Sequence, residues 1–297
     1  MSVVQAARPT ALAVVRAYVA LTKPRIIELL LVTTVPAMVV AAGGIPDLWL
    51  VAATLIGGAL AAGSANTFNS YLEADIDELM ERTRHRPLPD HRVVPRRALG
   101  FGVSLGVASF VWLVATVNLL AAVLASAAIF FYVVVYTLGL KRRSEQNIVI
   151  GGAAGCVPVL VGWAAVTGTV SPTAVLMFAI VFYWTPPHFW ALALKYREDY
   201  ARAGVPMLPV VRGPQETARQ ILLYTIMMVA VTLMLGAVGG MGLLYLGAAL
   251  ALGGVFLGMA VRLWRAPTEA HALRLFRFSI TYLGLLFAAM AVDAVLG

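Results

Sequence analysis

The chain has 297 residues, of which 61% are hydrophobic and only 12% are charged. Soluble domains carry about 25% charged residues, so this composition excludes an ordinary soluble domain and indicates a membrane protein. The net charge of +8 is compatible with nucleic-acid binding, but the positions of the basic residues explain it better as membrane topology, with no nucleic-acid partner. The single cysteine, Cys156, excludes an internal disulfide and a metal site made of several cysteines.

Apolar runs recur along the chain, and each is long enough to cross a hydrocarbon core of about 30 Å as a helix. We therefore predict an all-α, polytopic membrane protein that forms a single membrane domain over residues 1–297, with a cytoplasmic N-terminal segment at 1–24. The nine predicted spans lie at about 26–43, 48–70, 98–116, 119–139, 147–167, 172–194, 217–238, 241–262 and 276–295.

The connections between the predicted spans alternate between short, nearly uncharged turns and long, basic segments. All 22 Lys and Arg residues fall in the N-terminal segment or in the basic connections, which lie on one side of the predicted topology. The positive-inside rule makes that side cytoplasmic. The N-terminus is then cytoplasmic and, with nine spans, the C-terminus lies on the opposite side of the cell (inner) membrane.

A dense polar cluster at residues 69–89 follows the second predicted span directly. If the helix continues, Asn69, Glu73 and Asp77 lie on one face at spacings of four residues and extend over about 12 Å. This length is too great for all three to bind one ion, so either two ions share the face or a partner group bridges them. Asp75 points off this face unless the helix unwinds. Oxygen ligands of this kind favour Mg²⁺, which is commonly shared with substrate phosphates.

A second cluster follows the sixth predicted span, on the same side of the membrane. It contains Glu198 and Asp199 next to Lys195. On a continuous helix, His188 and Trp184 share a face with this cluster, although two consecutive prolines at 186–187 interrupt the register. The spacing of the two clusters suggests a weak internal echo between about 26–140 and 147–262, with both clusters facing one site.

Basic residues accompany both acidic clusters. Taken singly, each is explained by topology or by a plain salt bridge. Taken together with two acidic clusters, they indicate a site for a multiply charged anion and metal ions, and a diphosphate with an organic part in the membrane fits this description. The candidate substrate-binding residues are Lys23, Arg25, Arg82, Arg86, Lys141, Arg142, His188 and Lys195.

The spacing of Asn69, Glu73 and Asp77 resembles the first acidic motif of the UbiA-type intramembrane prenyltransferases. The string from Glu73 to Pro87 is similar to the protohaem IX farnesyltransferase (haem O synthase) branch of that family. Position 73 is Glu where the family usually has Asp, and the second cluster lacks the spaced aspartates of the quinone-pathway branch. Further matching strings are LTKPR at 21–25, QNIVIGG at 146–152, PHFWALA at 187–193 and REDYARAGVPMLP at 197–209.

The resemblance implies nine helices around a central cavity capped by cytoplasmic loops. It implies Mg²⁺-dependent transfer of a farnesyl group from farnesyl diphosphate to a vinyl carbon of haem b, with possible hand-over to a haem A-forming or oxidase-assembly partner. Aromatic faces such as Tyr71, Tyr136 or Trp184 could stabilise an allylic cation. The residues that the resemblance and the clusters together assign to metal binding or catalysis are Asn69, Glu73, Asp75, Asp77, Glu198 and Asp199.

Two other functions remain open from the sequence. One is a UbiA-type transferase for a quinone precursor or lipid acceptor, against which the strings at 187–193 and 197–200 argue. The other is a haem or lipid transporter, which needs charges within the spans to form a path. The predicted spans contain few such charges, with Glu28 near one end and Asp293 near the other.

Overall fold

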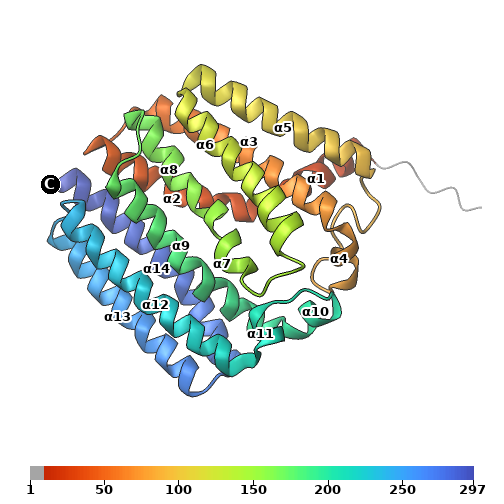
Figure 1. Ribbon diagram of the computed structural model, residues 1–297. Coiled ribbons are helices and arrows are strands. Elements are labelled where there is room, and N and C mark those ends of the chain that lie inside the picture. The colour runs from red at the N-terminus through yellow and green to blue at the C-terminus, as the bar shows by residue number, and fades with distance from the viewer. Residues whose placement is uncertain (1–9) are drawn as a thin grey trace, which may run out of the picture.

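The computed structural model describes residues 10–297, apart from the side chains of residues 25–31. This described part is helical and contains no strand (Figure 1). Eight segments are long and apolar enough to cross a membrane: α3 (Leu48–Leu72), α5 (Pro95–Thr116), α6 with η1 (Leu119–Phe130, Phe131–Leu140), α7 with α8 (Asn147–Gly151, Ala153–Thr167), α9 (Pro172–Lys195), α12 (Gly213–Val238), α13 (Leu243–Arg265) and α14 (Glu269–Leu296).

The prediction of an all-α, polytopic membrane protein is confirmed. Eight of the nine predicted spans coincide with these segments. The ninth, at about 26–43, falls on α2 (Pro24–Ala42), whose first half includes the side chains outside the description, so the count of nine stays a prediction. The remaining helices are short: α1 (Ala11–Thr22), α4 (Ala74–Leu79), α10 (Arg197–Arg202) and α11 (Leu208–Val211).

Polar caps at the short connections define where the spans begin. Asn118 Oδ1 accepts a hydrogen bond from the backbone N–H of Ala121 at 2.8 Å and starts α6. Ser171 caps α9, which has Pro172 at its first position. Asp293, near the end of α14, accepts hydrogen bonds from the backbone N–H groups of Gly242 and Tyr245 at the start of α13. This carboxylate therefore caps a neighbouring helix.

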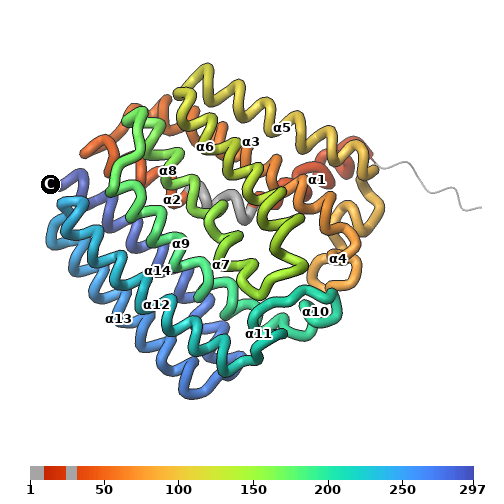
Figure 2. The backbone as a smooth tube through the Cα atoms, viewed as in Figure 1, coloured from red at the N-terminus to blue at the C-terminus, as the bar shows by residue number. Residues whose placement is uncertain are grey.

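The spans form two groups joined by α2 and α8 (Figures 1 and 2). Helices α3, α5 and α6 pack together on one side, and α9, α12, α13 and α14 pack together on the other. Helices α2 and α8 contact each other between the groups, and α8 also contacts α6 and α9. The pairs α3–α5 and α9–α12 occupy corresponding places in the two groups. The weak internal repeat between about 26–140 and 147–262 stays a prediction.

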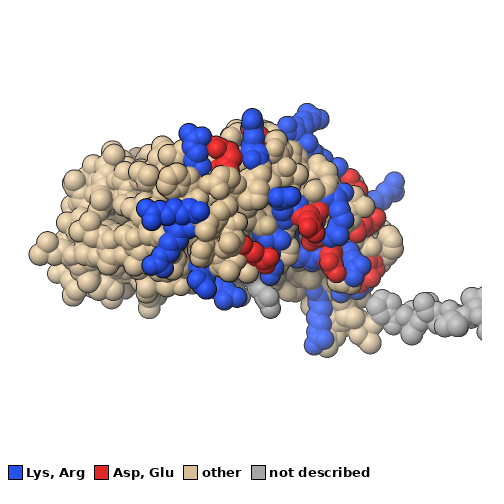
Figure 3. All heavy atoms as spheres, turned by 90° about the horizontal axis from the view of Figure 1, so that it is seen from below, with Lys and Arg blue, Asp and Glu red and all other residues tan. Residues whose placement is uncertain are grey.

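Charged side chains gather at one end of the molecule (Figure 3). This is the end where α4, α10 and α11 lie in Figure 1, while the opposite end shows almost no charge in this view. The basic connections inferred from the sequence are thus brought to one end of the helices. We therefore expect the functional site at this charged end, where the polar residues meet the apolar helices.

Helices α2 and α8 approach so closely that a methyl group does not fit between them. A Cβ atom on Gly162 would lie 2.7 Å from the backbone oxygen of Thr34. We expect Gly162→Ala to lower the free energy of unfolding by about 1–3 kcal/mol, because the backbones must move apart. Thermal unfolding in detergent measures this. Gly254→Ala on α13 is the control, since nothing lies within 4 Å of that position, and equal midpoints for both variants would contradict the packing argument.

Candidate functional site

The first acidic cluster lies at a break between two helices. Helix α3 ends at Leu72 and α4 begins at Ala74, so the predicted continuous helix is interrupted at Glu73, which has φ −110°. The spacing of four residues survives, because the N–H of Glu73 bonds to the oxygen of Asn69 and the N–H of Asp77 bonds to the oxygen of Glu73. Asn69, Glu73 and Asp77 are all buried, with exposed fractions of 2%, 1% and 2%.

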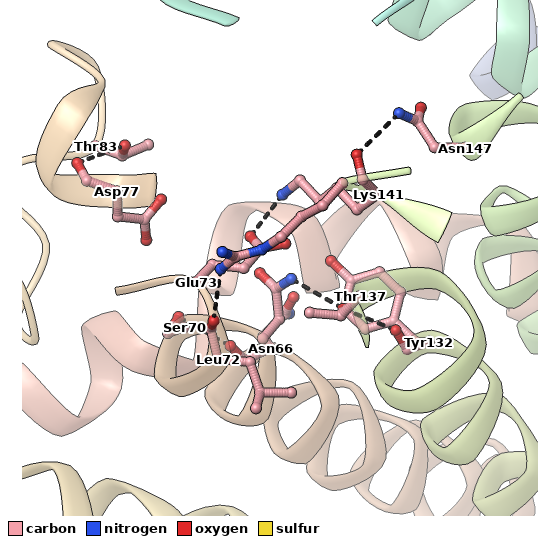
Figure 4. Close-up of polar contacts among 12 residues, drawn as sticks. Asn66, Ser70, Leu72, Glu73, Asp77, Thr83, Tyr132, Thr137, Lys141 and Asn147 are labelled. Carbon is pink, nitrogen blue, oxygen red and sulfur yellow. Dashed lines mark hydrogen bonds and ion pairs between the residues drawn. The ribbon is translucent and has the colours of Figure 1, made fainter. Parts of the chain in front are cut away.

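Each of these three side chains is held by a basic side chain from another segment. The cations come from the α1–α2 junction, from the end of η1 and from the segment after α4. Figure 4 shows Lys141 reaching from η1 toward Glu73. The three contacts join Lys23 Nζ to Asn69 Oδ1 at 2.6 Å, Lys141 Nζ to Glu73 Oε2 at 2.5 Å, and Arg86 Nη1 to both carboxylate oxygens of Asp77 at 2.8 Å.

Glu73 retains an unused oxygen. Its Oε1 atom is buried and has no hydrogen-bond partner, which is unusual for a carboxylate in a protein interior. Burial lowers the pKa of Lys141, but Glu73, Tyr132 and Tyr200 together outweigh burial and raise the pKa above its usual value. The charged form of Lys141 is therefore favoured, and Glu73 Oε1 is left for a further ligand.

Asn69 is oriented by the π-helix η1. The Thr137 hydroxyl donates to the backbone oxygen of Tyr132 at 2.8 Å, five residues earlier, and accepts from Asn69 Nδ2 at 3.2 Å. This contact turns the Asn69 carbonyl oxygen toward Lys23. A π-helix at this place agrees with the frequent occurrence of such helices at functional sites. Sequence reasoning missed both η1 and Thr137.

Asp75 lies away from the buried cluster. Its side chain is 65% exposed and accepts two hydrogen bonds from Arg142, at 2.7 and 2.8 Å. The hydrogen bond from Arg142 lowers the pKa of this carboxyl group. Arg142 also donates to the backbone oxygen of Leu72 at 3.1 Å, so it ties the end of α3 to the connection between η1 and α7. The structure therefore does not bring Asp75 or Arg142 to the predicted ligand group.

The second cluster adjoins the first through aromatic contacts. Arg82, which follows α4, and Lys195, at the end of α9, each lie 5.5 Å from the ring centre of Tyr196. Asp199 is buried and bonded to Arg202, whereas Glu198 is exposed.

No described residues form a cluster of three or more His, Cys, Asp or Glu side chains suited to a metal, so a joint metal site of both clusters stays a prediction. The Arg25 side chain lies outside the described residues.

A cavity of about 280 Å³ extends between the helices next to this polar cluster. Its walls come from α2, α3, α6, η1, α7, α8, α9 and α14, and none of the described residues that line it is an Asp, Glu, Lys or Arg. Tyr136 joins the two regions, because its ring lines the cavity and its centre lies 5.8 Å from Lys141 Nζ. His188 and Trp184 also line the cavity, whereas Tyr71 packs beside α1 instead.

The arrangement has a clear chemical meaning. Two buried carboxylates and three partly buried cations lie next to an apolar cavity, which suits a charged head group at the polar end and an apolar chain inside. Asn147, which sequence reasoning recorded only within a motif, is fully buried and donates to the backbone oxygen of Lys141 at 3.3 Å. Sequence reasoning also missed Ser279 on α14, because nothing distinguishes it in the sequence except that it is a polar residue in an apolar span.

Comparison with known proteins gives consistent results. Residues 30–287 match the UbiA prenyltransferase family. The chain is 58% identical to protoheme IX farnesyltransferase 1 of Saccharopolyspora erythraea, over 96% of this chain and 91% of that protein. It is 56% identical to protoheme IX farnesyltransferase of Frankia alni, over 95% and 98% of the two chains.

Solved structures share the fold at low sequence identity. A digeranylgeranylglyceryl phosphate synthase has a TM-score of 0.79 at 16% identity, covering 96% of this chain and 99% of that one. A UbiA homologue from Archaeoglobus fulgidus, bound to DMAPP and Mg²⁺, has a TM-score of 0.70 at 17% identity, covering 94% and 98%. Since the family match spans most of the chain and relatives above 55% identity cover nearly all of it, this protein belongs to the UbiA prenyltransferase family.

Proposed function

We propose that this protein transfers the farnesyl group of farnesyl diphosphate to a vinyl group of haem b, giving haem O and diphosphate. The names of relatives at 55–58% identity support this reaction. The structural observation that carries the proposal is the cluster of two buried carboxylates and one buried amide, each bonded to a partly buried cation, next to a cavity whose described walls are uncharged. Burial and the nearby Arg86 lower the pKa of Lys23 to about 7, so an added anion at this cluster would favour the charged form of Lys23.

The residues of the first cluster fit Mg²⁺. Glu73 Oε1 is a buried carboxylate oxygen without a partner, and Asn69 and Asp77 add the oxygen ligands that this ion prefers. When bound, Mg²⁺ would neutralise charge on the diphosphate as it leaves. Lys23, Lys141 and Arg86 then become available to donate hydrogen bonds to phosphate oxygens. In this proposal, Asp199 and Glu198 of the second cluster help to bind the metal ions at the same polar end of the cavity.

The cavity supplies the conditions for the transfer itself. The bond between the prenyl carbon and the diphosphate oxygen breaks, and its electron pair leaves with the diphosphate. The vinyl group supplies the electrons for the new carbon–carbon bond, water adds a hydroxyl group, and a proton is released. The apolar walls exclude premature water from the allylic cation, and the rings of Tyr136 and Trp184 on those walls can stabilise its charge.

A product assay tests the proposal. The purified protein is incubated with haem b, farnesyl diphosphate and Mg²⁺, and the haem is analysed by mass spectrometry. We expect farnesylated haem in the complete mixture and none after chelation of Mg²⁺. A prenylated product from 4-hydroxybenzoate, with none from haem, would instead assign the chain to a quinone-pathway activity. Hand-over of the product to a haem A-forming or oxidase-assembly partner stays a prediction.

A transporter would need charges within the spans to form a path, and one of the two that the sequence offers, Asp293, already has another role. Asp293 binds the backbone N–H groups at the start of α13, so its carboxylate is used in helix capping. Glu28 lies among the side chains outside the description. Loss of product formation in Asp77→Ala and Asp199→Ala supports an enzyme. Unchanged haem O formation in both, together with a loss of haem transport, would support the transporter.

The orientation in the membrane is open to a labelling test. We propose that α4, α10 and α11 face the cytoplasm of a cell (inner) membrane. Cys156 is fully buried, so the native chain gives a low background with a maleimide reagent. In intact cells, an impermeant maleimide is expected to label Ile45→Cys, between α2 and α3, and to leave Glu81→Cys unlabelled until the membrane is opened. Labelling of Glu81→Cys from outside would reverse the orientation. Both positions are exposed.

A further inference from the structure

His188 on α9 is enclosed by four side chains, those of Trp184, Phe189, Phe276 and Ser279, which fix its ring. Trp184 stacks on one face, with ring centres 4.3 Å apart and planes 20° apart, and Phe276 of α14 lies 4.7 Å away. Its Nδ1 atom is 2.6 Å from Ser279 Oγ. Trp184 is held in turn, because its Nε1–H donates to the backbone oxygen of Ser279 at 2.8 Å. The imidazole therefore has one orientation.

The hydrogen bonds also determine which ring nitrogen carries the proton. The Ser279 hydroxyl has a single proton, which it donates to the backbone oxygen of Phe276 at 2.6 Å. Ser279 Oγ must then accept from His188, so the proton of the neutral imidazole is on Nδ1. Nε2 is left with a free lone pair, and no described residue forms a hydrogen bond with it.

The edge that carries Nε2 faces the cavity. His188 is only 7% exposed, yet it lines the cavity, and its Nδ1 side is occupied by Ser279 while Trp184 and Phe276 cover its faces. Phe189, whose ring is perpendicular to the imidazole with centres 5.1 Å apart, lines the cavity beside it. The part of the ring left to meet the cavity is the edge that carries Nε2. Among the described lining residues, His188 offers the only imidazole, and there is no thiol, thioether or carboxylate beside it.

Resting on the proposed function, we propose that His188 Nε2 binds the iron of haem b as an axial ligand and that Ser279 positions the imidazole for this bond. A neutral histidine whose second nitrogen donates to a fixed acceptor is the common form of a metal-binding histidine. The lone pair of Nε2 forms the bond and the Nδ1 proton stays in place. Because His188 and Tyr136 line the same cavity, an iron held at His188 sets how far the vinyl group lies from the diphosphate end.

A role as a proton acceptor fits the surroundings less well. Protonation of Nε2 would create an imidazolium in a cavity whose described walls carry no carboxylate to balance it. Binding to iron requires no new charge on the ring. The same surroundings that disfavour an imidazolium therefore leave the lone pair available to a metal.

The test uses the full-length protein in detergent, without farnesyl diphosphate, and compares ferric haem b with metal-free protoporphyrin IX. The native protein is expected to show the electronic and EPR spectra of nitrogen-ligated haem. His188→Ala should lose this signature and bind haem b at least about tenfold more weakly, while its affinity for protoporphyrin IX stays within about twofold. Added imidazole should restore the nitrogen-ligated spectrum. Ser279→Ala should keep the spectrum but weaken haem b binding about tenfold.

Three results would overturn the inference: native protein without nitrogen-ligated haem, a His188→Ala spectrum identical to that of the native protein, or equal loss of both porphyrins in that variant, which indicates a packing role. If His188→Ala does not stay monodisperse, His188→Gln replaces it under the same criteria. The product assay is separate. Ligated haem without farnesylated product would disprove the proposed function alone, and product without ligation would disprove this inference alone.

Discussion

Glu73→Gln is expected to lower the rate of farnesyl transfer by about 10²–10³-fold, the scale of losing one charge-stabilising group from an active site. The substitution keeps the size of the side chain but removes the negative charge that holds Lys141 at 2.5 Å, and it replaces one of the two carboxylate oxygens by an NH₂ group that repels a metal ion. The measurement is the rate of haem O formation at saturating farnesyl diphosphate, with a titration of Mg²⁺ to report the apparent metal affinity.

Glu81→Gln is the matched control for this prediction. It is the same chemical change, eight residues further along the same polar segment, at an exposed position. Its rate is expected to remain within about twofold of the native rate, as for a surface substitution away from the site. Equal rates for both variants would remove Glu73 from the catalytic cluster and would shift attention to Asp77 and Asp199.

Lys141→Met is expected to lower the free energy of unfolding by about 3–5 kcal/mol, because it leaves the buried Glu73 carboxylate without its partner. The double variant Lys141→Met with Glu73→Gln should regain most of that loss, since no charge then remains to be paired. Unfolding in detergent without added metal, followed for the native protein, both single variants and the double variant, gives the coupling energy directly. Additive effects in this cycle would show that the ion pair contributes nothing to stability.

The spans and the acidic motif could be predicted from the sequence because both depend on local patterns. Apolar length sets the helices, and the basic residues mark the connections that the structure brings to one end of the molecule. Asn69, Glu73 and Asp77 followed from helical spacing alone. Even the break at Glu73 did not alter their alignment, because the backbone bonds four residues apart persist through it.

The partners of these residues could not be predicted, since they depend on how distant segments pack. Lys23 and Asn69 are 46 residues apart in the chain, and Glu73 and Lys141 are 68 apart. Ser279 is 91 residues from His188. Asp75 points off the buried face, as the helical spacing predicts, but its partner Arg142 is 67 residues away in the chain. The π-helix η1 has no simple sequence pattern, because its composition matches that of an ordinary apolar helix.

The buried cluster supplies its own counter-ions, and this has a consequence for the protein without bound metal. Because Lys141 and Arg86 offset Glu73 and Asp77, the buried carboxylates have counter-ions from the chain itself and do not need a divalent ion to balance their charge. Removal of divalent ions is therefore expected to leave the fold of the polar end intact.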